Sequence, residues 1–162
     1  MKSIIQILDK ILAAALISAM SCILLAVSWQ VISRYLLGDP SSVTEELARF
    51  LLIWIGMLGA VYAYRQNAHL GLNLLLDKMH PVRQRLTRAG IQIVVIIFSA
   101  LVLLYGGSEL VDLTMELNQI SAALGINMGY VYAVLPISGG MLILYALFNL
   151  TELFSTQAQE NN

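Results

Sequence analysis

The stretch ILAAALISAMSCILLAVSWQVI, residues 11–32, runs for 22 residues without a charged side chain. A helix needs about 20 apolar residues to cross a bilayer, because hydrocarbon offers no hydrogen-bond partner to a free backbone amide. We therefore expect residues 11–32 to span a membrane. This expectation sets the fold class as an all-α integral membrane protein.

Three further segments meet the same requirement. Residues 50–64 are uncharged, and a helix that begins at Val43 makes this segment long enough to span. Residues 89–108 are uncharged, and so are residues 117–151, of which 128–150 would form a fourth span. The sequence thus predicts four transmembrane helices in one membrane domain, residues 1–155, followed by a polar tail, residues 156–162.

The composition agrees with a membrane protein. The chain is 59% hydrophobic and 12% charged, whereas a soluble domain is about 25% charged. Its formal net charge is −1, and it has no basic face to neutralise phosphates, so nucleic acid is excluded as a partner. The expected surroundings are the lipid bilayer.

The positions of the basic residues predict the orientation. Loops on the cytoplasmic side carry an excess of Lys and Arg. Lys2 and Lys10 precede the first span, and five more basic residues lie between the second and third: Arg65, Lys78, Arg83, Arg85 and Arg88. We therefore expect both termini to be cytoplasmic.

Two connections have recognisable local signals. Ser42 stands three residues before Glu45, the spacing of a capping box for a helix that starts near Val43. Between the second and third spans, apolar residues follow a helical period, which predicts a short amphipathic interfacial helix: Leu72, Leu75, Leu76 and Met79.

The last two spans have unusual features. The third helix is expected from Pro81 to about Leu117, which at 1.5 Å per residue is ~55 Å and exceeds the ~30 Å hydrocarbon core. In the fourth, Pro136 predicts a kink, and Gly139 with Gly140 predicts close helix packing, with a substrate-facing break as the alternative.

Four charged residues lie near the non-cytoplasmic ends of the first two spans: Arg34, Glu45, Glu46 and Arg49. Glu45 precedes Arg49 by four residues, the favourable order on a helix. A charge near the membrane is costly unless it is paired. The interpretations are a structural ion-pair cluster, a contact to another membrane protein, and a substrate or proton site.

Catalysis and cofactor binding find no support in the sequence. Both histidines, His69 and His80, lie between the second and third spans, so the spans offer no histidine pair for haem. There is no nucleophile with a base, no phosphate loop and no metal-ligand spacing. We assign no catalytic, cofactor-binding or metal residue, and expect no enzymatic activity.

One dense stretch resembles a known family. Arg34-Tyr35, the run TEELAR over residues 44–49, Trp54, Gly59-Ala60, Arg65 and His69 follow in the order typical of the small membrane subunit of tripartite ATP-independent periplasmic (TRAP) transporters. The likeness is dense over residues 31–75. Val43 departs from it, since an aromatic residue is usual there.

The resemblance implies a bacterial inner-membrane protein that works with two partners, a large membrane subunit and a periplasmic substrate-binding protein. In the family the large subunit carries the sodium and substrate sites and moves like an elevator, and the small subunit resembles a scaffold. Substrates are organic acids of the C4-dicarboxylate or sialic-acid type. The third helix would carry an acidic stripe made of Glu109, Asp112 and Glu116. This stripe is either a solvated helix face or a contact to the binding protein.

Two other functions remain as alternatives from the sequence. An independent four-helix exporter usually keeps an acidic residue in the middle of its first helix, and residues 11–32 have none. A membrane anchor of a respiratory enzyme usually needs histidine ligands within its spans.

Overall fold

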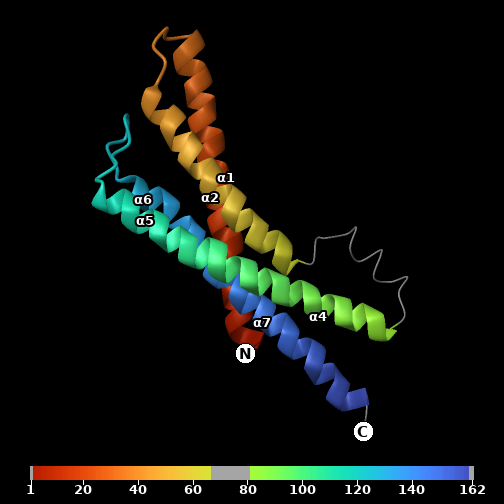
Figure 1. Cartoon of the computed structure of the whole chain (residues 1–162). Coiled ribbons are helices and arrows are strands. Elements are labelled where there is room, and N and C mark those ends of the chain that lie inside the picture. Colours follow the sequence, from red (N-terminus) through yellow and green to blue (C-terminus); the bar gives the residue numbers. More distant parts are fainter. Residues whose placement is uncertain (1, 67–80, 161–162) are drawn as a thin grey trace. The chain divides into compact units, whose positions relative to one another are not determined.

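The computed structural model describes residues 2–66 and 81–160, which are mostly helical (Figure 1). The elements are, in chain order, α1 (Lys2–Tyr35), α2 (Ser42–Arg65), α4 (Pro81–Phe98), the π-helix η1 (Ser99–Gly106), α5 (Gly107–Glu116), α6 (Met128–Tyr132) and α7 (Val134–Glu160). In the described part of the chain, extended pairing is limited to an isolated antiparallel bridge between Ile120 and Asn127.

Four helical stretches are long and apolar enough to cross a membrane: Ile5–Tyr35, Ser42–Arg65, Arg83–Glu116 and Met128–Thr151. This confirms the predicted all-α fold with four spans. Large apolar side chains point outward along them, as at Leu25 and Leu86, which are 73% and 76% exposed. A bilayer accommodates such surfaces, whereas soluble monomers rarely carry them in continuous patches.

Three of the predictions made from the sequence remain predictions. The proposed amphipathic helix and both histidines, His69 and His80, lie outside the described residues. The cytoplasmic location of both termini stays a prediction, as does the single membrane domain over residues 1–155. At the other end, α7 continues through Glu160, so the predicted polar tail begins within a helix.

The chain divides into two compact units, each made of two separate stretches. The first unit comprises Met1–Tyr62 and Glu109–Val134, and the second comprises Ala63–Ser108 and Leu135–Asn162. Each unit has its own buried side chains. Phe50, Leu58 and Val61 are buried in the first unit, and Leu103 and Tyr145 in the second.

The turn between α1 and α2 ends in a helix cap. Ser41 Oγ accepts a hydrogen bond from the Thr44 N–H at 3.4 Å, and the Ser41 carbonyl accepts one from the Glu45 N–H at 3.3 Å. Ser41 is therefore the N-cap. The prediction of Ser42 as the cap was wrong by one residue: α2 starts one residue earlier, which puts Thr44 at the position that the capping box assigned to Glu45.

The third span is one long helix that changes type in its middle. Its 34 residues, Arg83–Glu116, confirm the predicted long helix. Within it, η1 is a π-helix, in which hydrogen bonds reach one residue further than in an α-helix. Ser99, at the start of η1, is fully buried, and its Oγ has no hydrogen-bond partner among the described residues.

Glycines let helices of the second unit approach closely. A Cβ added at Gly139 would lie 2.8 Å from Leu103 Cβ and 3.0 Å from the backbone nitrogen of Leu104. This confirms the packing interpretation for Gly139. A Cβ added at Gly140 would meet nothing within 4 Å, so Gly140 takes no part in this contact.

The predicted kink near Pro136 is a break between α6 and α7. Proline has no N–H, and its ring clashes with the carbonyl four residues earlier. That residue is Tyr132, where α6 ends. The start of α6 is fixed by Asn127, whose Oδ1 accepts a hydrogen bond from the Gly129 N–H at 2.8 Å.

Candidate functional site

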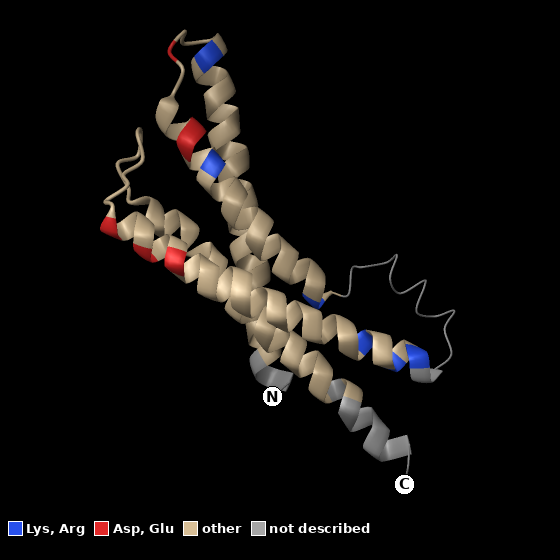
Figure 2. Cartoon of the chain, in the orientation of Figure 1, with Lys and Arg blue, Asp and Glu red and all other residues tan. Residues whose placement is uncertain are grey.

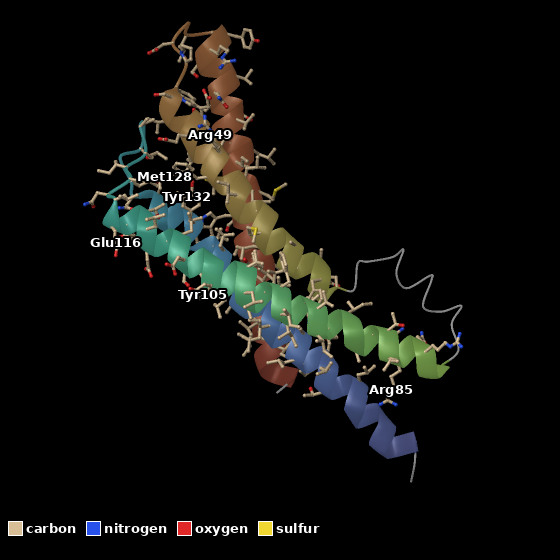
Figure 3. All side chains as sticks on the ribbon, viewed as in Figure 1. Arg49, Arg85, Tyr105, Glu116, Met128 and Tyr132 are labelled. Atoms are coloured by element: carbon tan, nitrogen blue, oxygen red, sulfur yellow. The ribbon has the colours of Figure 1, made fainter. Side chains whose placement is uncertain are left out.

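The four predicted cluster residues do not form one ion-pair group. Arg49 contacts Glu45, with 3.3 Å between Nη2 and Oε1. Figure 2 shows where charged residues lie along α2, and Figure 3 labels Arg49 on this helix. Both side chains are exposed, at 65% and 51%. An exposed pair of this spacing contributes about 0.3–0.5 kcal/mol, so it does little to hold the fold.

Glu46 instead binds backbone amides far along the chain. Its Oε1 accepts a hydrogen bond from the Ala122 N–H at 3.2 Å, and its Oε2 accepts from Ala123 and Leu124 at 2.8 Å each. Three amides thus converge on one carboxylate. Because all these residues belong to the first unit, Glu46 fixes the start of α2 to the turn before α6.

Arg34 lies apart from these contacts. It is exposed in the last turn of α1, where a positive charge interacts favourably with the helix dipole. No ion pair joins Arg34 to Glu45 or Glu46 in the described part of the chain. A role for these four residues at a subunit interface stays a prediction.

A second long-range hydrogen bond ties α2 to α6. The Trp54 indole N–H donates a hydrogen bond to the Val131 carbonyl at 3.1 Å. This carbonyl lies in the last turn of α6. Glu46 and Trp54, two turns of α2 apart, therefore hold one stretch, residues 122–131.

The other family-motif positions have different surroundings. Tyr35 is 80% exposed and Ala60 is exposed, and a Cβ added at Gly59 would meet nothing within 4 Å. The contacts of the described residues do not show what these three residues do, so their roles stay predictions.

Arg65 closes α2 within the second unit. Its guanidinium lies 5.7 Å from the centre of the Tyr145 ring and 5.8 Å from that of Phe148. Both distances are within the range of cation–π attraction, and the positive charge also suits the C-terminus of a helix. Arg65 thus attaches the end of α2 to α7, while the motif partner His69 is outside the described residues.

The acidic stripe lies on α5, and its three members are exposed: Glu109, Asp112 and Glu116 (Figures 2 and 3). Its contact to a binding protein stays a prediction. Across residues 2–66 and 81–160, no group of three or more His, Cys, Asp or Glu side chains is placed to hold a metal ion.

Sequence reasoning missed the long-range contacts of α2, among them those of Glu46 and Trp54. Glu46 was expected to pair with a positive side chain, and its partners are backbone amides that no residue pattern marks. The segment does contain residues that are typical of turns and caps. Asn118 and Gly125 adopt positive φ, and Asn127 caps α6.

Comparison with known proteins identifies relatives of the whole chain. Residues 23–156 match the family described as "Tripartite ATP-independent periplasmic transporters, DctQ component". A protein of Haemophilus influenzae named as a TRAP transporter small permease protein is 28% identical over 156 residues, 96% of this chain and 93% of the relative. The sialic acid TRAP transporter small permease protein SiaQ of Vibrio cholerae is 30% identical over 159 residues, 94% of this chain and 87% of the relative.

A third relative is much longer. The isethionate TRAP transporter permease protein DctMQ of Oleidesulfovibrio alaskensis is 28% identical over 142 residues, which are 83% of this chain and 22% of that protein. The matched region is there one part of a longer permease chain.

Proposed function

Since the chain belongs to the small-subunit (DctQ) family of TRAP transporters, we propose that it is the scaffold for a large elevator-type permease subunit in a sodium-coupled uptake system for organic acids. The third member of this system is a periplasmic substrate-binding protein.

The family and the four spans make the chain a multi-pass protein of the bacterial inner membrane. Small permease subunits of this family pair with a large one, and the isethionate relative carries a region like this chain within a longer permease. The relatives are transporter subunits, a family not known for enzymatic activity. This favours the subunit interpretation over an independent exporter and over a respiratory anchor.

The distribution of ionisable residues carries the scaffold proposal. Residues 11–32, 89–108 and 117–151 contain no Asp, Glu, Lys, Arg or His. Ion and proton pathways through membranes depend on ionisable or polar groups at depth, because an organic anion or a cation needs a counterpart there. Three spans without such groups suit the support of a transporting partner.

The ties of α2 support the same role. A scaffold must keep its shape while its partner moves. Glu46 and Trp54 hold residues 122–131 to α2 in the first unit, and Arg65 holds the end of α2 to α7 in the second. These contacts resist sliding of α2 past its neighbours.

The proposed substrate is an organic acid of the C4-dicarboxylate or sialic-acid type. Two relatives are named for sialic acid and isethionate, which are both organic acids. The exposed stripe Glu109, Asp112 and Glu116 is the proposed contact for the binding protein, with a solvated helix face as the alternative.

Reconstitution tests the assignment. The chain, its large subunit and the binding protein are placed in or around liposomes, and uptake of labelled sialic acid and C4-dicarboxylates is measured with and without an inward sodium gradient. The complete set should transport only with the gradient, and omission of this chain should abolish uptake. Undiminished uptake without this chain would overturn the proposal.

The scaffold role has a separate test. After Cys22 is replaced by serine, spin labels at Leu37 and Tyr130, both exposed in the first unit, report one distance within this subunit. In the assembled complex that distance should be the same with and without substrate-loaded binding protein. A second distance population during transport would contradict a rigid support.

A further inference from the structure

The turn that holds Glu46 has the chemistry of a carboxylate receptor. Ala122, Ala123 and Leu124 present three consecutive N–H groups to the two carboxylate oxygens, at 3.2, 2.8 and 2.8 Å. Successive backbone amides that point into one concavity bind anions through their partial positive charges. Hydrogen bonds with an ionised acceptor are also stronger than those between neutral groups.

The donors to this carboxylate are the three amides and the side chain of Ser121, which all belong to the same turn. Arg49, three residues along α2, is directed to Glu45 instead. The turn therefore balances the Glu46 charge with oriented backbone dipoles. A free carboxylate of similar size would find the same donors.

The turn is also held together without Glu46. The Ser121 N–H donates to the Ile126 carbonyl at 2.9 Å, and Ser121 Oγ accepts from the Ile126 N–H at 3.3 Å. The Gly125 N–H donates to the Ser121 carbonyl at 3.2 Å, and its φ of +66° is one that glycine adopts without strain. These bonds close the turn on itself, so the three donors stay in place when the carboxylate is removed.

We propose that residues 121–125 form a carboxylate-binding site that Glu46 occupies within the chain, and that removal of the Glu46 side chain opens it to a free small carboxylate such as formate or acetate. The inference does not depend on which solute the complex carries.

Hydrogen exchange of the assembled complex tests the proposal. In Glu46→Ala, the amides of Ala122, Ala123 and Leu124 should exchange at least tenfold faster than in the wild type. Sodium formate should restore their protection in a saturable way, and sodium chloride at equal ionic strength should not. Glu45→Ala is the matched control: it removes the neighbouring carboxylate, which contacts Arg49, and should leave these amides unchanged.

Glu46→Gln provides a second measurement that does not require the side chain to be lost. Its amide keeps the shape but replaces one acceptor oxygen by a donor, so exchange should rise by less than in Glu46→Ala. Formate should then protect nothing, because the side chain fills the site.

Three results would overturn the proposal. One is wild-type protection of the three amides in Glu46→Ala. Another is an equal effect of formate on the wild type, Glu45→Ala and Glu46→Ala, which would indicate a solvent effect. The third is equal protection of Glu46→Ala by chloride, which would show a general ionic effect and not carboxylate binding.

Discussion

Two adjacent glycines on α7 offer a matched test of the helix packing. Gly139→Ala adds a methyl group 2.8 Å from Leu103 Cβ, whereas carbon atoms pack best at about 3.5–4.0 Å. Two of the three nearest atoms are backbone atoms, of Leu103 and Leu104, at 3.2 and 3.0 Å, so the neighbouring helix itself must shift. Gly140→Ala adds the same methyl group where nothing lies within 4 Å.

The comparison isolates the packing cost. Replacement of glycine by alanine in a helix stabilises by about 1 kcal/mol, and this contribution is common to both variants. Overpacking costs about 1–3 kcal/mol and applies to Gly139→Ala alone. We therefore expect Gly139→Ala to be less stable than Gly140→Ala by about 1–3 kcal/mol.

Equilibrium unfolding of the purified full chain in mixed micelles, followed by circular dichroism, measures this difference. The free energy of unfolding of the wild type should lie between those of the two variants or close to that of Gly139→Ala. Equal free energies of unfolding for the two variants, or a lower value for Gly140→Ala, would refute the close approach of α7 to η1.

Other substitutions test the ties and the surface pair. Trp54→Phe removes the indole donor to Val131 and should lower the free energy of unfolding by about 1 kcal/mol in the same assay. The control Trp29→Phe changes a side chain that is 50% exposed and should have little effect. Equal losses of stability in the two variants would count against the hydrogen bond from Trp54 to Val131. Arg49→Ala should change stability by less than about 0.5 kcal/mol, yet reduce recovery of the complex and uptake without altering the substrate affinity of the binding protein; wild-type yield and uptake would remove the interface hypothesis.

The sequence predicts the spans well because the bilayer imposes a simple condition. An uncharged run of about 20 residues has few alternatives to a spanning helix, which is why residues 11–32 and 89–108 were found directly. Helix boundaries followed from local chemistry. Pro81 was expected to begin the third helix and does so, and the cap of α2 was misplaced by one residue because Ser41 and Ser42 are both good caps.

The long-range contacts depend on tertiary structure and leave little trace in the sequence. The pair Glu45–Arg49 was predicted because its spacing is local. The amides that bind Glu46 are 76–78 residues away and belong to two alanines and a leucine, whose side chains say nothing of their backbone N–H groups. The π-helix η1 was likewise not predicted, because no residue pattern in Ser99–Gly106 marks it.

In the proposed function, this chain supports transport but does not carry it out. Purified chain alone is reconstituted in liposomes, and entry of labelled sialic acid and C4-dicarboxylates is followed under an inward sodium gradient. We expect no entry above that of empty liposomes with this chain alone, and entry once the large subunit and loaded binding protein are added. Saturable entry with this chain alone would contradict it.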